Sequence, residues 1–218
     1  MSSTESSEDT GFVLQVDAGD LIRHVNEAWL RFGRENQLGD RPLLGRGLFE
    51  FITDLPTQQL YQSLLEHVRR SGRPVRFAFR CDSPSLRRFM EMQMSLLPKD
   101  GVEFRSRLLR TEARKPVSLL DPTVPRSPQL IRMCAWCKQV AVPDWVEVEC
   151  ALARTGWFEH ATLPQVSHGI CPLMRRTHER QPKCLPCEVT CGCSKSVPIR
   201  LIDDKLSRPY GIRSCHWP

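Results

Sequence analysis

The stretch MCAWCKQVAVPDWVEVECALARTGWFEHATLPQVSHGICP (Met133–Pro172) carries a pair of sulfur or nitrogen ligands at each end. Cys134 and Cys137 form a Cys-x-x-Cys pair, and His168 and Cys171 form a His-x-x-Cys pair. Thiolate and imidazole are ligands that Zn²⁺ prefers, and two such pairs can converge on one tetrahedral ion although they lie far apart in the sequence. The stretch therefore predicts a zinc site built from Cys134, Cys137, His168 and Cys171.

A short helix is expected between the two pairs. Asp144 followed by Glu147 has the spacing of a capping box, and Gly156 is suited to end the helix. So short a helix buries little apolar surface, so a metal that crosslinks its two flanks would stabilise a small module at residues 131–174. A thioredoxin-like Cys-x-x-Cys should open a helix, whereas the residues after Cys137 run into Pro143, which disfavours that redox motif.

The composition is that of a soluble globular chain. It has 218 residues, of which 40% are hydrophobic and 26% charged. No apolar run approaches the ~18 residues needed to cross a bilayer, and the first ten residues are acidic and polar, unlike a signal peptide. We therefore expect a cytoplasmic protein without membrane contact. In that compartment the ten cysteines are interpreted as metal ligands or thiols and not as disulfides.

The net charge of +6 is unevenly distributed. Residues 122–218 carry +5 of it, so the C-terminal half is the basic half. A basic patch favours nucleic acid or anionic partners, whereas a solvated, arginine-rich tail has the same composition. Salt-dependent retention on DNA or RNA would separate the two interpretations, because phosphate contacts weaken steeply with salt.

The N-terminal half has the pattern of a mixed α+β domain. Residues 1–11 are expected to be disordered, a hairpin follows over 12–25, and Asn26 is the expected N-cap for a helix through about Glu35. A second helix over residues 55–70 has one apolar face and ends at Gly72. Three alternating strand patterns follow, marked by Val75, Phe77 and Phe79, then Met90, Met92, Met94 and Leu96, then Val102, Phe104 and Leu108. This order predicts an antiparallel five-stranded sheet with helices on one face.

Two tight turns are expected in that sheet. Gly19 in the first hairpin and Gly101 in Pro98-Lys-Asp-Gly101 are the residues that we expect to supply the permissive backbone, with a positive φ at Gly101.

This half resembles the PAS family of sensory domains. The resemblance rests on Val25-Asn-Glu-Ala-Trp29, on the helix end His67-Val-Arg-Arg-Ser-Gly-Arg-Pro74 and on the three strands that follow, and it covers about residues 12–110. It implies a sheet that cups a pocket for a ligand or cofactor, or a domain that dimerises. We take 12–112 as this domain and expect it to fold alone. Residues 113–130, rich in proline, are interpreted as a semi-rigid linker.

The stretch 131–174 resembles a zinc-ribbon-like appendage of bacterial signalling proteins, whose ends read Cys-x-Trp-Cys-Lys and Ser/Thr-His-Gly-Ile-Cys-Pro-x-Cys. This chain departs from that pattern because Met174 occupies the place of the last cysteine. His168 is one candidate for the fourth ligand, and Cys184 or Cys187 from the tail are the others. The Cys-rich, basic tail 175–218 lacks apolar periodicity and is expected to be poorly ordered.

These patterns lead to one main hypothesis of function. We expect a bacterial, cytosolic signalling protein, in which a PAS-like domain binds a small ligand or a protein partner and is coupled to a zinc-binding interaction module. Homodimerisation through the PAS-like domain is compatible with it. The alternatives are a zinc-dependent nucleic-acid-binding regulator and a redox switch in which Cys134 and Cys137 form a disulfide and release zinc.

An enzyme and a coloured cofactor are both expected to be absent. No nucleophile, base and orienting group can be assembled from these residues. His67 is interpreted as a residue at the edge of the helix and not as a haem ligand, and Cys81 lacks the motif of a flavin-adduct domain.

Overall fold

The computed structural model describes residues 11–35, 42–157 and 162–179. The chain divides into two compact units, residues 1–170 and 171–218, and each is described by itself. The expectations for residues 1–10 and for the tail beyond Glu179 lie outside the described residues. Within the described ranges, no helix combines the length and the apolar character needed to span a membrane.

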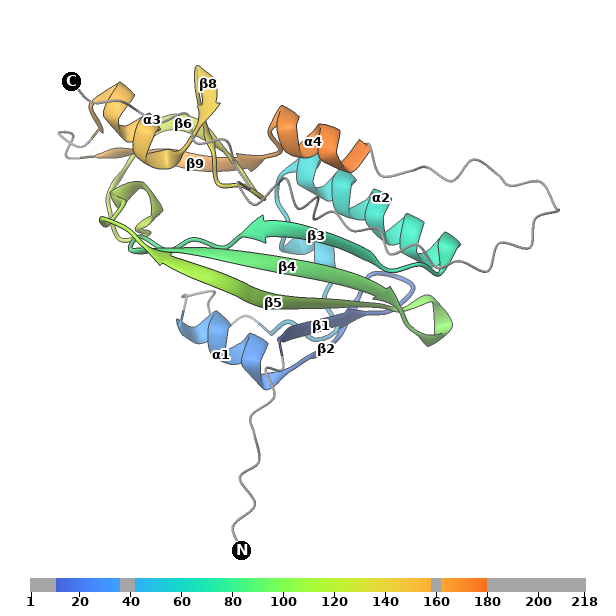
Figure 1. Ribbon diagram of the computed structural model, residues 1–218. Coiled ribbons are helices and arrows are strands. Elements are labelled where there is room, and N and C mark those ends of the chain that lie inside the picture. Colours follow the sequence, from blue (N-terminus) through green and yellow to red (C-terminus); the bar gives the residue numbers. More distant parts are fainter. Residues whose placement is uncertain (1–10, 36–41, 158–161, 180–218) are drawn as a thin grey trace, which may run out of the picture. The chain divides into compact units, whose positions relative to one another are not determined.

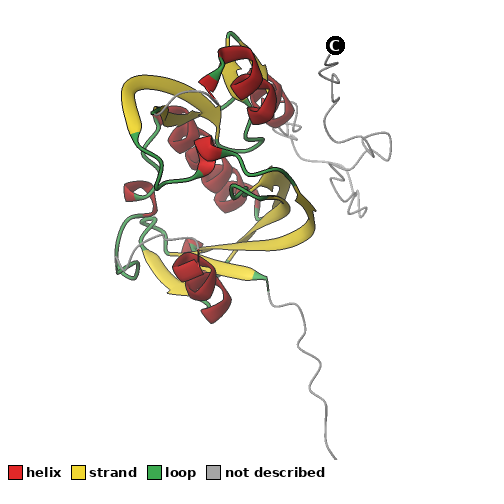
Figure 2. Cartoon of the chain, turned by 90° about the vertical axis from the view of Figure 1, so that its left-hand side faces the viewer, coloured by secondary structure: helices red, strands yellow, loops and turns green. Residues whose placement is uncertain are grey.

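The first unit opens with an antiparallel five-stranded sheet in the order β2-β1-β5-β4-β3 (Figure 1). Its strands are β1 (Phe12–Val16), β2 (Ile22–Val25), β3 (Val75–Arg80), β4 (Leu86–Leu96) and β5 (Val102–Ala113). Figure 2 shows that the strands are strongly curved. The mixed α+β architecture with five antiparallel strands agrees with the prediction and is consistent with a PAS-like fold.

The alternation in the sequence determines which side of this sheet is buried. Val75 and Phe77 on β3, Met90 and Met94 on β4, and Val102 and Phe104 on β5 are all buried. In the ladder Phe77 lies opposite Met92, and Met94 lies opposite both Val75 and Phe104, so the apolar residues of three strands meet on one face. A shift of one residue would turn this whole set to solvent.

The two hairpin turns differ from the prediction in where the backbone becomes left-handed. Positive φ occurs at Asp20 (61°) in the first turn and at Lys99 and Asp100 (58° each) in the second, whereas Gly101 has φ −67°. Asp20 is a residue type that tolerates this conformation. Gly101 is needed for space instead, because a Cβ there would lie 3.0 Å from the backbone oxygen of Val16.

Helices α1 (Glu27–Glu35) and α2 (Leu55–Ser71) begin at the caps that local hydrogen bonds define. The Oδ1 atom of Asn26 accepts a hydrogen bond from the backbone N–H of Trp29 at 2.9 Å, which confirms the predicted cap. Asp54 caps α2 in the same way through Thr57 N, also at 2.9 Å. Gly72 ends α2 with φ 65°, the left-handed conformation that glycine adopts without penalty.

A second sheet, in the order β8-β7-β6-β9, completes the first unit. Its strands are β6 (Arg126–Cys134), β7 (Val140–Val142), β8 (Asp144–Val146) and β9 (Leu163–Gly169), and β6 and β9 run parallel. Helix α3 (Val148–Thr155) covers a core formed by Val117, Leu119, Ile131, Met133, Val140, Val148, Ala151, Leu152 and Leu163. The proline-rich stretch 113–130 therefore contains two buried core residues, the 3₁₀ turn Ser118–Leu120 and the first half of β6.

Helix α3 starts later than the sequence predicted. Asp144, the expected cap, lies in β8, where it pairs with Val142, and Glu147 occupies the N-cap position without a side-chain cap hydrogen bond. Pairing with β7 satisfies the backbone of residues 144–146 in a strand, so the helix cannot begin before Val148.

Of the second unit, the structure describes Cys171 and helix α4 (Pro172–Glu179). The backbone N–H of Met174 points at the sulfur of Cys171, with an N···S distance of 3.5 Å. Met174 thus contributes its main chain to the surroundings of this cysteine.

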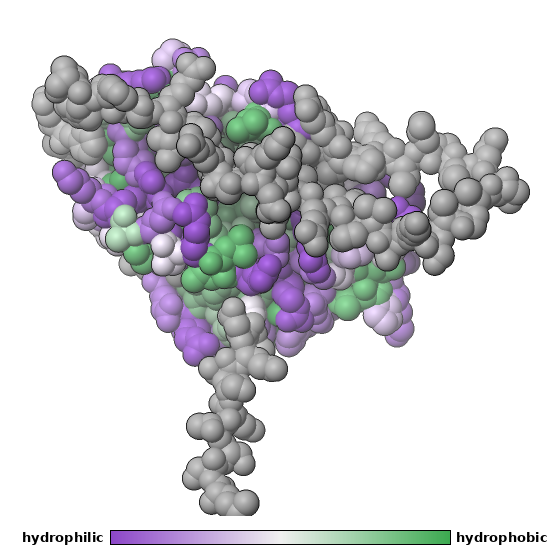
Figure 3. Space-filling model, in the orientation of Figure 1, coloured by the Kyte–Doolittle hydropathy of each residue, from purple (hydrophilic) through white to green (hydrophobic). Residues whose placement is uncertain are grey.

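The exposed side of the long hairpin β4–β5 carries ion pairs. Arg107 pairs with Glu91 at 2.8 Å and Arg105 with Glu103 at 2.9 Å, and Arg110 pairs with Glu112. On the face shown in Figure 3, hydrophilic residues enclose smaller hydrophobic areas. Much of the arginine charge on this hairpin is therefore neutralised locally.

Candidate metal centre and adjoining cavity

Cys134 and Cys137 lie in a tight turn at the end of β6. The carbonyl of Cys134 accepts the N–H of Lys138 at 3.0 Å, and the N–H of Cys134 donates to the carbonyl of Gln139 at 2.7 Å. Lys138 has a φ of 62°, which reverses the chain directly after the second cysteine. This closed turn holds the two cysteines of the Cys-x-x-Cys pair side by side.

Strand β9 runs beside that turn and ends level with it. Cys134 is paired with Gly169 in the parallel ladder, and the N–H of Ala135 donates to the carbonyl of Gly169 at 2.8 Å. Cys171 follows two residues later in the chain. The sulfur atoms of Cys134, Cys137 and Cys171 lie within 4.8 Å of one another, and all three residues are buried.

The donor set fits zinc. Zn–S bonds of ~2.3 Å in a tetrahedral site place the sulfur atoms about 3.8 Å apart, a spacing that small side-chain rotations reach from the observed one. The cluster can therefore hold a metal ion. Three thiolates would supply three ligands of a structural site, and among the described residues no histidine, aspartate or glutamate joins this group of ligand atoms.

His168 lies outside the group of three sulfur atoms. It is opposite Met133 in the ladder, one position before the residue that pairs with Cys134. Burial of the ring and the charge of Lys138 lower the pKa of His168, with Asp54 and Cys134 acting in the opposite direction. A neutral imidazole is the form that binds metal. Its role as the fourth ligand stays a prediction, and Cys184 and Cys187 lie outside the described residues.

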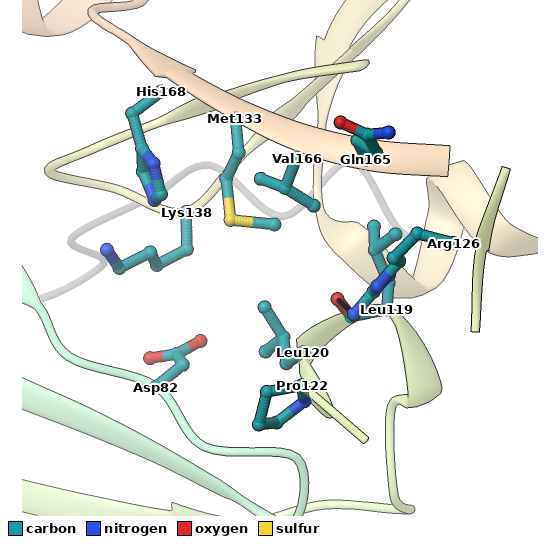
Figure 4. A pocket seen from close by; sticks show the side chains of 10 residues that line it. All are labelled: Asp82, Leu119, Leu120, Pro122, Arg126, Met133, Lys138, Gln165, Val166 and His168. Atoms are coloured by element: carbon teal, nitrogen blue, oxygen red, sulfur yellow. Dashed lines mark hydrogen bonds between the residues drawn. The ribbon is translucent and has the colours of Figure 1, made fainter. Parts of the chain in front are cut away.

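His168 and Lys138 line a cavity of about 360 Å³ together with Asp82 (Figure 4). The amino group of Lys138 donates to the carbonyl of Ala135 at 2.9 Å. Burial lowers the pKa of Lys138. Figure 4 shows His168 beside Lys138, with the carboxylate of Asp82 across from them. The same two residues also line a second cavity.

This second cavity, of about 390 Å³, lies against the inner face of the five-stranded sheet. Helix α1 contributes Trp29, helix α2 contributes Tyr61, and the sheet contributes Met92 and Phe104. The Cys-x-x-Cys turn contributes Ala135 and Trp136. The volume falls within the range of small-molecule pockets.

Trp136, between the two cysteines, is the residue that joins the turn to the first sheet. Its indole ring is stacked on Phe77 of β3, with ring centroids 4.3 Å apart and an angle of 9° between the planes. It also meets Tyr61 of α2 edge-on at 6.5 Å, and its carbonyl accepts the N–H of Arg80 at 2.7 Å. Only 4% of Trp136 is exposed. The candidate metal turn is thus packed against the five-stranded sheet and helix α2.

Tyr61 occupies an apolar environment beside this indole. Burial raises the pKa of Tyr61 to about 12, and the nearby N–H of Trp136 offsets part of the rise. The two groups do not meet hydrogen-bond geometry, so the indole N–H is left without this partner.

A buried ion network forms a second connection between the two sheets. Arg80, 2% exposed, contacts Asp82, which is fully buried, and donates to Glu147 at 2.7 Å. Arg114 pairs with Asp82 at 3.2 Å and with Glu149 at 3.3 Å. Burial acts to lower the pKa of Arg80, but Asp82 and Glu147 together raise it above its ordinary value.

Sequence reasoning missed Trp136, Arg80 and Lys138 as parts of this region. A metal-binding Cys-x-x-Cys turn needs only its two cysteines as ligands, so the large aromatic residue between them, Trp136, indicated that the turn also packs against another part of the chain. The ion network offered no such signal, because Arg80 and Glu147 come from separate modules. Two further residues considered from the sequence, Cys81 and His67, are not part of the cysteine cluster. Burial raises the pKa of the Cys81 thiol, and burial together with Arg70 and Arg73 lowers the pKa of His67. The expected absence of haem and flavin stays a prediction.

No family model matches the chain, and no curated protein matches it. Solved structures similar to it include a domain of an HTR-like protein from Haloarcula marismortui, at 16% identity over 46% of this chain and 99% of that one. Another is the photoactive yellow protein domain of the sensor histidine kinase Ppr from Rhodospirillum centenum, at 20% identity over 49% and 93%. A third is the sensor region of a sensor histidine kinase, at 12% over 49% and 42%. The TM-score is 0.34 in each case. These neighbours are PAS-like sensor domains, and similarity at this level carries no argument about ligand or activity.

Proposed function

We propose that this chain is a sensory or signalling protein in which a ligand-binding, PAS-like domain is coupled to a zinc-binding module used for protein interaction. The observation that carries the proposal is the position of Trp136. It lies between Cys134 and Cys137, which are candidate metal ligands, and it forms part of the wall of the 390 Å³ cavity. A change at the cysteines, such as the binding of zinc, is therefore transmitted to the cavity wall through the indole ring of Trp136, and a change in the cavity is transmitted to the cysteines in the same way.

The metal half of the proposal rests on Cys134, Cys137 and Cys171, with His168 proposed as the fourth ligand. Zinc bound there would act as a structural crosslink between the end of β6 and the residue that follows β9. Its charge would also hold the three thiols in the deprotonated form. The chain's own contribution is to close the turn at Lys138 and to keep the site out of solvent.

The sensory half rests on the cavity and on its connections. A ligand in the cavity contacts α1, α2, the sheet and the Cys-x-x-Cys turn at once, so it can favour one packing of these elements over another. Output is proposed to pass to a protein partner in a bacterial cytoplasm, without catalysis by this chain.

Metal analysis of the full chain, purified under reducing conditions, tests the proposal. We expect one zinc per chain in the wild type and none in Cys134→Ser or Cys171→Ser. Cys81→Ser is the matched control, since Cys81 is outside the cluster, and it should retain the metal. Wild-type protein that is folded but free of zinc would contradict the metal half.

One observation favours a redox switch as a second candidate. Sulfur atoms within 4.8 Å of one another can form a disulfide after modest movement. Mild oxidation should then release zinc and block two thiols from alkylation, with recovery on reduction. Loss of zinc without loss of two thiols would rule this candidate out. Nothing in the described residues specifically favours the nucleic-acid alternative.

A further inference from the structure

Two buried polar atoms on the wall of the 390 Å³ cavity have no hydrogen-bond partner among the residues that the structure describes. They are the Oγ1 atom of Thr57 and the Nε1 atom of Trp136. Both residues are 4% exposed and both line the cavity. Native proteins rarely leave such groups unpaired, so each one indicates a missing partner.

The two groups differ in what they require. An indole N–H is a donor only, so Trp136 needs an acceptor, whereas the Thr57 hydroxyl can donate or accept. The caps at the start of α2 do not satisfy the hydroxyl, because Asp54 receives the backbone N–H of Thr57 and not its side chain. In an empty cavity water would serve both groups, and a ligand that displaces it must replace those hydrogen bonds.

The rest of the wall is mainly aromatic and apolar. The lining includes Trp29, Tyr61, Phe79, Phe104 and Met92. Aromatic walls of this kind favour flat molecules, because face and edge contacts with rings add to the gain from burial. Phe77 backs the ring of Trp136 in a parallel stack, so the indole N–H is held in a fixed direction.

We propose that this cavity binds a planar, largely apolar small molecule that carries a hydrogen-bond acceptor for Trp136 Nε1–H and a second polar group beside the Thr57 hydroxyl. The inference rests on the sensory half of the proposed function and specifies its ligand class. It makes the tryptophan of the Cys-x-x-Cys turn a ligand-contacting residue, so the ligand touches the candidate metal turn directly.

Quinoline and naphthalene form a matched pair of probes. They have the same two-ring shape, but only quinoline has a ring nitrogen that accepts a hydrogen bond. We expect quinoline to bind the full chain about tenfold more tightly than naphthalene, the difference that one hydrogen bond to a buried donor supplies. In a ¹H–¹⁵N spectrum, quinoline should shift the indole resonance that is missing in Trp136→Phe. The indole resonance of Trp145, which is not part of the cavity lining, should stay unmoved.

Three variants test the proposed hydrogen bonds. Trp136→Phe removes the N–H but keeps a ring on Phe77, and it should reduce the preference for quinoline to about one. The double variant Trp136→Phe/Thr57→Val makes the cavity apolar at both positions and should bind naphthalene more tightly than the wild type does. Thermal unfolding shows whether each variant is folded, and Tyr61→Phe shows whether the tyrosine oxygen, and not the ligand, accepts the hydrogen bond of the indole N–H.

Three results would each overturn the proposed ligand class. The first is equal affinity for quinoline and naphthalene, and the second is an unchanged preference for quinoline in Trp136→Phe. The third is an indole resonance that moves in Tyr61→Phe but not when quinoline is added. Failure of both probes to bind a folded, zinc-loaded chain would also overturn it, and it would leave the metal half of the proposed function intact. A chain that lacks zinc but binds quinoline as expected would contradict the metal half of the proposed function and support the proposed ligand class.

Discussion

Among single residues, Arg80 is a buried side chain whose loss we expect to destabilise the chain strongly. Asp82 is fully buried, and Arg80→Ala removes one of the two guanidinium groups that neutralise it. Leaving a buried charge short of its partner destabilises a protein by about 3 kcal/mol. Denaturant unfolding of the full chain should show this loss. The control is Arg23→Ala, which breaks the solvent-exposed pair with Asp17 and should cost much less, because exposed ion pairs contribute little to stability.

The result also bears on what the network does. If Arg80→Ala unfolds as the control does, Asp82 is sufficiently neutralised by Arg114 and the Arg80–Glu147 connection between the two sheets contributes little.

His67 gives a prediction about pH. Its pKa in the folded chain is lowered from 6.5, mainly by burial, so the unfolded chain binds a proton more readily. Its full contribution to stability is therefore present above pH 6.5 and is lost as the pH falls from 6.5 through the folded-state pKa. Thermal unfolding between neutral and mildly acidic pH should show a smaller loss in His67→Gln than in the wild type. The exposed His24→Gln is the control, and an identical pH profile in His67→Gln would show that this residue is not responsible.

At the scale of elements, the end of α2 depends on one glycine. Gly72 has φ 65°, and its N–H donates to Val68 O at 2.9 Å. Gly72→Ala places a Cβ in a left-handed conformation and should cost about 1 kcal/mol, whereas Gly72→Asn should cost less. Calorimetry of the two variants measures the difference. Space is not the cause, since a Cβ there meets nothing within 4 Å, so equal stability of Ala and Asn variants would contradict the backbone explanation.

The elements that could be predicted from the sequence are those determined by nearby residues. The first helix could be predicted from its cap at Asn26, and the second from the apolar face of residues 55–70 and the glycine that ends it, Gly72. The alternation of apolar residues around Phe77 correctly predicted which side of that strand is buried. The parallel pairing of β6 with β9 was not predicted, because its partners are separated by a helix and a long connection. The start of α3 was misplaced for the same reason, since the pairing of Asp144 with Val142 overrides the local capping pattern.

In the candidate site, too, the residues that could be predicted are those recognised from the local sequence pattern. The spacing of Cys134, Cys137 and Cys171 could be read directly, because ligand type and turn length are properties of the local sequence. Trp136 and Lys138 lie in the same segment, but their roles depend on residues of β3, α2 and β9 that contact them only in the folded chain. Spacing alone therefore could not show that the metal turn lines a cavity.

At the scale of the whole molecule, the two halves should depend on each other. A chain of residues 1–121 lacks Trp136, which covers Phe77, and Glu147, which pairs with Arg80. Loss of a large buried aromatic residue costs about 3 kcal/mol or more. We expect residues 1–121 to unfold cooperatively but at a lower temperature than residues 1–176. Equal melting temperatures would show that the first sheet does not need the second half.

If Trp136 connects the cysteine cluster to the cavity, its indole resonance should respond when zinc is removed and restored. We predict that a chelator shifts the Trp136 resonance of the reduced full chain, that added zinc restores it, and that the Trp145 resonance changes much less. Cys134→Ser should show the shifted position from the start. A Trp136 resonance that stays in place while zinc leaves the protein would show that Trp136 does not connect the cluster to the cavity.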